Sequence, residues 1–97
     1  METYIVLVNF TEQGVKDIKN GPSRLEAARA AYKSIGGELK AFYLTLGRYD
    51  AIVIGDVPNA KAGAGLALAI GMQGNIRTES VRAFNEAEYA EITSALP

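Results

Sequence analysis

The side chains that could carry chemistry in this sequence are carboxylates, arginines and tyrosines, because histidine and cysteine are both absent. Their absence removes disulfides, thiolate nucleophiles and imidazole bases, and it removes the usual ligands of zinc and most transition metals. Carboxylates remain as metal ligands, but no residues have the spacing of a calcium-binding loop. We therefore expect neither a metal nor a cofactor.

Six polar residues form the candidate site, which we call the polar edge: Asn9, Arg48, Tyr49, Asp50, Asn75 and Arg77. A guanidinium group binds carboxylate or phosphate through two hydrogen bonds, so Arg48 and Arg77 favour an anionic group. Tyr49 would supply an aromatic wall, and Asp50 would orient an arginine or accept a proton from the ligand. The polar edge therefore predicts a binding site for a small polar or anionic molecule, and no catalytic residue is assigned.

Local turn chemistry is the alternative interpretation of the same residues. In that case Asn9 and Asp50 bond free backbone groups, Arg48 is exposed, and Tyr49 packs on a helix. The positions of the two arginines distinguish the interpretations, because a site needs both guanidinium groups around one cleft.

Other carboxylates could in principle form a catalytic pair. The expected strand directions separate them, with Asp50 at one end of the sheet and both Asp56 and Glu38 at the other. Arg77 and Glu79 lie two residues apart on a strand and share one face. They are either a pair that protects a sheet edge or the polar wall of a cleft.

Four strands and three helices must position these residues: strands Thr3–Phe10, Glu38–Leu46, Asp50–Val57 and Asn75–Phe84, and helices beginning near Ser23, Asn59 and Asn85. The first strand carries no charge and is rich in β-branched residues, which is typical of a strand buried on both faces. Ser23 and Glu26 have the spacing of a capping box, as do Asn85 and Glu88.

The order of these elements predicts a single domain over residues 1–97 with a ferredoxin-like α+β fold, βαββαβ with an added C-terminal helix. Its antiparallel sheet has the strand order 4-1-3-2. Charges support this order independently, because the second and fourth strands carry charges along their length while the first has none. Edge strands need such protection and central strands do not. In this topology the residues of the polar edge meet at one end of the sheet.

The central strands are too apolar for a domain that works alone. Ile5–Val8 and Ala51–Ile54 are continuous apolar runs, so both faces of the sheet need cover, although the helices lie on only one. The C-terminal helix is expected to cover part of the other face. Residues 62–73 are uncharged, and a helix that is apolar all round is typically buried all round. We therefore expect a homodimer or a higher homo-oligomer.

Composition and the N-terminal residues indicate which other partners and which cellular location to expect. The net charge is −1 and no basic stripe is present, so we expect no nucleic-acid partner. No cationic segment precedes an apolar one at the N-terminus, so we expect no signal peptide. The uncharged stretch 62–76 is too short for a membrane span, and a cytoplasmic location follows by default.

Three segments of the sequence resemble the GYD-domain family. They are Asn9–Gly14, Gly47–Asp50 and Gly74–Glu79. The family is named for a Gly, a Tyr and an Asp, which match Gly47, Tyr49 and Asp50, and the resemblance extends at least from Tyr4 to Ile92. The resemblance implies a ferredoxin-like fold of the dimeric α/β-barrel type and an oligomer. It supplies no reaction, because the family has no established biochemical function.

The function predicted from the sequence is that of a homo-oligomeric domain that binds a small polar or anionic ligand at a cleft. A cofactor-free small enzyme of the monooxygenase or isomerase type remains an alternative, as does a purely structural assembly unit. An enzyme should contain a closed, mostly apolar pocket with a few aimed polar groups, and a binding module should contain an open cleft.

Overall fold

The computed structural model describes residues 1–97, and its elements follow the predicted order. Two short helical turns, α1 and the 3-10 helix η1, precede the first long helix. The bounds are β1 Glu2–Phe10, α1 Glu12–Lys16, η1 Ile18–Asn20, α2 Gly21–Ser34, β2 Glu38–Leu44, β3 Ala51–Val57, α3 Ala60–Gly71, β4 Ile76–Ala83 and α4 Glu86–Ser94. None of the helices combines the length and apolar character needed to cross a membrane.

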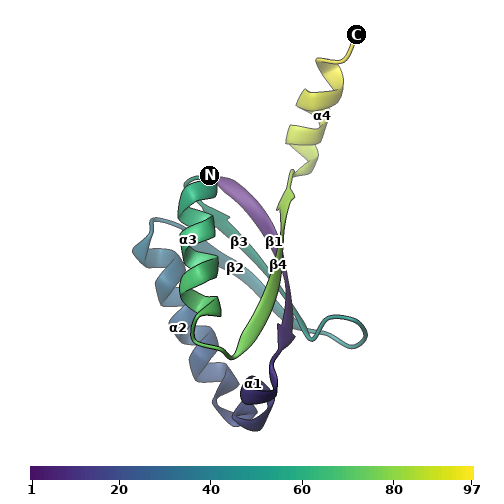
Figure 1. Cartoon of the computed structure of the whole chain (residues 1–97). Coiled ribbons are helices and arrows are strands. Elements are labelled where there is room, and N and C mark those ends of the chain that lie inside the picture. The colour runs from purple at the N-terminus through teal and green to yellow at the C-terminus, as the bar shows by residue number, and fades with distance from the viewer.

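The four strands form one antiparallel sheet in the order β2-β3-β1-β4, which is the predicted order read from the other edge. Helices α2 and α3 lie side by side on one face of this sheet (Figure 1). Strand β1 is central, and its Val8 lies opposite Ala51 of β3 and Thr78 of β4. The predicted ferredoxin-like fold is confirmed.

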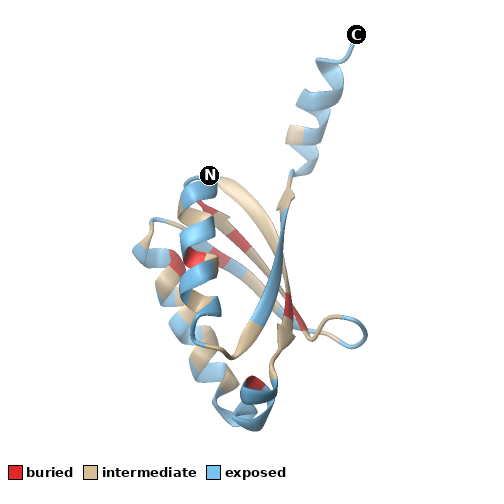
Figure 2. Ribbon diagram, viewed as in Figure 1, coloured by how far each residue is buried: buried red, intermediate tan, exposed pale blue.

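The hydrophobic core lies between the sheet and the two long helices. Its centre contains Tyr32 of α2, Leu39 of β2, Val57 of β3 and Leu66 of α3. Burial raises the pKa of the Tyr32 hydroxyl above its usual value. Only 8 of the 97 residues are buried, and no large side chain is completely enclosed, so a single copy has a thin core (Figure 2).

The second face of the sheet carries no helix, and we call it the open face (Figure 1). Since Val8 and Val53 point toward the helices, the alternation of a strand places Leu7 and Ile54 on the opposite side. Apolar side chains on the open face come from all four strands: Ile5, Leu7, Tyr43, Ile52, Ile54 and Val81. The centre of the sheet is therefore apolar on both faces, as its sequence predicts, while the chain covers only one.

The predicted start of the first long helix is wrong. Helix α2 begins at Gly21, with Pro22 in its first turn, and Ser23 lies inside the helix, where its hydroxyl donates to the carbonyl of Asn20. Proline is well suited to the first turn because the backbone N–H that it lacks would have no partner there. Strand β2 ends at Leu44, two residues earlier than predicted, and this lengthens the connection to β3.

Helix α4 does not cover the sheet, contrary to the sequence-based expectation. It continues outward from the end of β4 and lies apart from the remainder of the chain (Figure 1). Its predicted capping box is confirmed, because the Asn85 side chain accepts from the N–H of Glu88 and the Glu88 carboxylate accepts from the N–H of Asn85. The side chains of Tyr89 and Ile92 are exposed. Local sequence thus determines where α4 begins, while its apolar stripe has no partner within the chain.

Replacing Asn85 with alanine removes one half of this capping box. We expect a loss of about 1 kcal/mol of helix stability, confined to α4, since removing an N-cap side chain typically costs that much. Amide hydrogen exchange of residues 86–94 should accelerate severalfold, while exchange in the sheet stays unchanged. Unchanged exchange in α4 would contradict the assignment of Asn85 as its cap.

Candidate functional site

The strand directions bring most of the polar edge to one end of the sheet. Asn9, near the end of β1, pairs with Arg77, near the start of β4. Val8 pairs with Ala51, so Asp50 lies beside the end of β1 as well. This end of the sheet is opposite the end from which α4 projects, because β4 runs from Ile76 to Ala83.

Asp50 holds the ends of two strands together. Its Oδ2 accepts a hydrogen bond of 2.9 Å from the backbone N–H of Phe10, and its own N–H donates to the carbonyl of Val8 at 2.8 Å. No ion pair joins it to an arginine. Asp50 therefore acts in the turn, as the alternative interpretation of the sequence supposes, and does not orient a guanidinium group.

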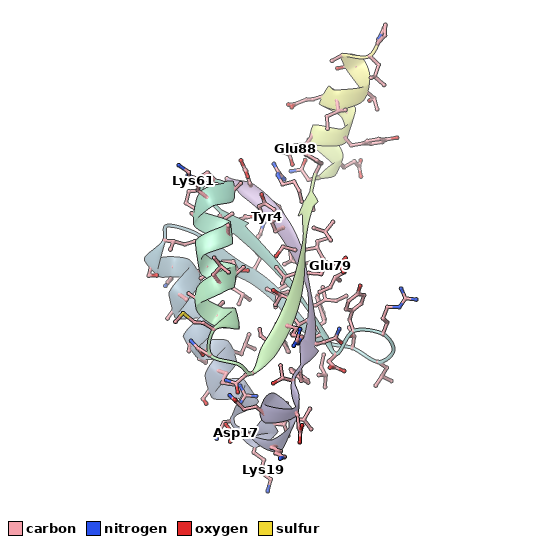
Figure 3. All side chains as sticks on the ribbon, in the orientation of Figure 1. Tyr4, Asp17, Lys19, Lys61, Glu79 and Glu88 are labelled. Atoms are coloured by element: carbon pink, nitrogen blue, oxygen red, sulfur yellow. The ribbon has the colours of Figure 1, made fainter.

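Tyr49 lies on the open-face side of the sheet. Its hydroxyl donates to Oε1 of Glu79 at 3.2 Å, and Glu79 lies opposite Leu7 on the open face, on the side away from α2 and α3 (Figure 3). The hydroxyl of Thr45 donates to the carbonyl of Tyr49 at 2.7 Å and holds the loop closed. The supposed packing of Tyr49 on a helix is wrong, and Glu79 joins the site although it was not among the six predicted residues. Its alternation with Arg77 along β4 is the signal that indicates it.

Arg48 and Arg77 are both exposed and make no ion pair or hydrogen bond within the chain. Arg48 lies in the loop between β2 and β3, where Gly47 adopts a φ of +108° that favours glycine. Arg77 lies on the open face, two residues before Glu79 on β4. The polar edge thus presents two cationic groups with unused hydrogen-bond donors.

Asn75 faces the other side of the sheet. Its Oδ1 accepts from the Gln13 side chain at 3.0 Å, and its carbonyl accepts from the N–H of Thr11 at 3.1 Å. It also lines a cavity of about 380 Å³ between the sheet and α2. Asn75 therefore joins β4 to the start of α1 and is separated from the face that carries Arg77.

Two adjoining cavities lie on the helix side of the sheet, with volumes of about 380 and 530 Å³. Both are mostly apolar, and no aspartate or glutamate lines either one. Arg24, the cationic residue in the smaller cavity, already forms an ion pair of 3.1 Å with Asp17. Among the carboxylates considered for catalysis, Asp56 accepts from Thr3 at 2.6 Å and lies 3.6 Å from Lys40. The two cavities therefore contain none of the carboxylates considered for catalysis.

A four-stranded antiparallel sheet with two helices on one face and βαββαβ connections defines this chain as a ferredoxin-like domain. More specifically, it belongs to the GYD domain family, whose sequence model matches residues 4–93. The resemblance carried by Gly47, Tyr49 and Asp50 is thereby confirmed.

Known proteins resemble the chain in sequence and in fold. A Thermus thermophilus protein named glutamine synthetase and cystathionine beta-lyase binding protein is 27% identical over 89 residues, which cover 91% of this chain and 94% of that protein. A feast or famine regulatory protein from M. tuberculosis, solved in complex with L-methionine, has a TM-score of 0.67 and 22% identity. The match covers 88% of this chain and 51% of the regulatory protein, so the chain spans about half of its length. A second solved structure, of a protein from Thermus thermophilus, has a TM-score of 0.56 and 20% identity, with 88% and 95% of the two chains covered.

Proposed function

We propose that this chain is a ligand-binding domain that pairs with a second copy through the open face of its sheet and takes a small polar or anionic ligand at the polar edge. The observation that carries the proposal is the uncovered apolar surface of the open face, which lies beside two unpaired arginines.

The open face is suited to packing against the open face of a second copy. Ile5 lies opposite Ile54, and Leu7 opposite Ile52, so the two central strands present four adjacent aliphatic side chains with no charge among them. Contiguous apolar patches of this kind mark interaction surfaces, since water around them is unfavourable. Two sheets that stack face to face bury such side chains in a shared layer about 10 Å thick. A second copy would thus add the core that the single chain lacks.

The polar edge is suited to a small anion. Arg48 and Arg77 have free donors. Tyr49 follows Arg48 on a loop held by Thr45, and its phenol bonds Glu79, two residues after Arg77 on β4. The M. tuberculosis regulatory protein with the same fold was solved with L-methionine, an amino acid that carries a carboxylate. A free carboxylate would meet a guanidinium group at the polar edge through two charge-assisted hydrogen bonds.

Replacing Arg77 with glutamine should weaken the binding of a small anion at least tenfold, because charge-assisted hydrogen bonds contribute about 1.5–3 kcal/mol. Isothermal titration with sulfate, phosphate and L-methionine measures this effect. The matched control is Lys33→Gln, which removes an exposed cation that makes no ion pair on α2. Equal affinity of the Arg77 and Lys33 variants, or no binding by the unmodified chain, would contradict the proposed ligand site.

A second candidate function is the binding of an enzyme as protein partner. The relative from Thermus thermophilus is named for that activity and matches this chain along nearly its whole length. The exposed side chains of Leu68 and Met72 on and after α3 would provide a contact surface. Titration of the labelled chain with purified glutamine synthetase tests this candidate. If the candidate is correct, binding should be saturable, and the Leu68→Asp substitution should abolish it. Binding that is absent, or that Leu68→Asp leaves intact, would remove it.

A further inference from the structure

Helix α4 exposes an apolar stripe that its own chain does not cover. It has nine residues, and an isolated helix of that length is marginal in water even with good caps. Its capping box is nevertheless complete, and its exposed stripe contains Tyr89 and Ile92. Glu86 and Glu88 lie on either side of this stripe at helical spacing, and α4 contains no cation.

The connection from β4 directs α4 away from its own sheet. Only Phe84 and Asn85 separate the two elements. The guanidinium carbon of Arg82 lies 4.3 Å from the centre of the Phe84 ring, and Arg82 also donates to the carbonyl of Thr3. The stack and the cap accompany this outward direction, in which the stripe of α4 lies away from the open face of the same chain (Figure 1).

The loop between β2 and β3 provides the complementary surface. It projects from the sheet on the side away from the helices (Figure 1), and Leu46 within it is 100% exposed. The exposed ring of Tyr43 lies just before it on β2. Arg48 follows in the same loop, and Arg77 lies at the same end of the sheet. The exposed Leu46, with the unpaired Arg48 and Arg77 at the same end of the sheet, thus complements the apolar stripe of α4 and the carboxylates that flank it.

Charge selects how two copies would be related. If the strands of both copies ran in the same direction, both acidic helices would lie at one end of the dimer and both pairs of free arginines at the other. If the strands run in opposite directions, the α4 helix of each copy lies at the polar edge of the other. Interfaces place opposite charges together and avoid like charges, so the second arrangement is favoured. In a two-fold symmetric dimer the contact between α4 and the polar edge of the other copy then forms twice, once at each end.

We infer that α4 of a second copy docks against the loop 45–50 and closes the polar edge, with Tyr89 and Ile92 on Leu46 and with its glutamates facing Arg48 and Arg77. The inference rests on the proposed pairing through the open face. The partner's helix then forms an outer wall of the ligand site, and an entering anion has to displace glutamates from the two arginines.

Cross-linking tests the inference directly, because the chain contains no native cysteine. Leu46→Cys and Tyr89→Cys variants are mixed in equal amounts and treated with a short thiol cross-linker. The expected product is the mixed species that joins position 46 to position 89, in severalfold excess over the 46–46 and 89–89 species. The control replaces Leu46→Cys with Lys61→Cys, at the start of α3 and the other end of the sheet (Figure 3), and should give little product with Tyr89→Cys.

The outcomes separate this inference from the proposed function. A dimer mass with dominant 46–46 product would overturn the docking of α4 and leave the pairing of open faces intact. A dimer mass without any product at position 89 would do the same. A mass of one chain with no cross-linked species would overturn both. A further variant, Glu86→Lys, should lower the yield of the 46–89 species severalfold, and an unchanged yield would remove the role of charge in the docking.

Discussion

Replacing Leu7 with glutamate is expected to separate the proposed dimer while leaving each copy folded. The Leu7 side chain points to the open face, opposite Ile52 of β3 and Glu79 of β4, so a carboxylate there would be buried against an aliphatic side chain and a like charge once two sheets stack. An uncompensated buried charge costs about 3–5 kcal/mol, which corresponds to a loss of at least about a hundredfold in the association constant. In a single copy the same carboxylate reaches water, so folding should persist. Light scattering together with circular dichroism measures both properties.

Two control variants place the effect on the open face. Val53→Glu lies on the helix side of β3, beside the core, and should unfold the chain instead of dissociating it. Ala30→Glu lies on the exposed surface of α2 and should change neither mass nor fold. A Leu7→Glu protein that keeps the mass of the unmodified dimer would show that the open face is not the interface.

Replacing Gly14 with alanine is expected to destabilise the fold, although alanine is the better helix former. A Cβ at this position would lie 2.1 Å from the backbone oxygen of Asn75, which also accepts from the N–H of Thr11. The backbone of α1 and the start of β4 would have to move apart. Overpacking of this kind costs about 1–3 kcal/mol, and each kcal/mol lowers the Tm of a domain of this size by about 4–8 °C.

The matched control for Gly14 is Gly65 in the interior of α3, where an added Cβ meets nothing within 4 Å. Gly65→Ala should therefore raise the free energy of unfolding by up to about 1 kcal/mol, through helix propensity alone. Opposite signs for the two substitutions are the expected result in thermal denaturation. A stabilising Gly14→Ala would show that α1 does not approach β4 as closely as described.

Strand order and the end of the sheet that carries the polar edge are both predictable from the sequence. Charges mark β2 and β4 as edges, and once the order is known the strand directions bring Asn9, Asp50 and Arg77 together. Both features follow from the alternation of side chains along each strand and from the order of the elements, and both can be read from the sequence. The family resemblance around Gly47, which the match to the GYD family confirms, also implies the ferredoxin-like fold.

The orientation of individual site residues is not predictable in the same way. Asn75 turns to the helix side because Gln13 and Thr11, far earlier in the chain, bond to it. The Asp50 carboxylate accepts a hydrogen bond from the N–H of Phe10, and this bond depends on where β1 ends. Such choices are made by contacts between distant segments, and no local pattern encodes them.

The position of α4 also lies beyond what periodicity can predict. The capping residues Asn85 and Glu88 show where the helix begins, and the spacing of Tyr89 and Ile92 shows that it has an apolar stripe. Neither signal says which surface the stripe contacts. The expectation that it covers its own sheet is wrong because the two-residue connection after β4 points the helix outward.

Whether the open face is an interface is decided most directly by the association state of the unmodified chain. Sedimentation equilibrium at micromolar concentrations should give a mass twice that of the 10.4 kDa chain, or a larger multiple. The same measurement on the Leu7→Glu variant should give the single-chain mass. A mass of 10.4 kDa for the unmodified protein at every concentration would contradict the pairing of open faces, and with it the site that the second copy is proposed to complete.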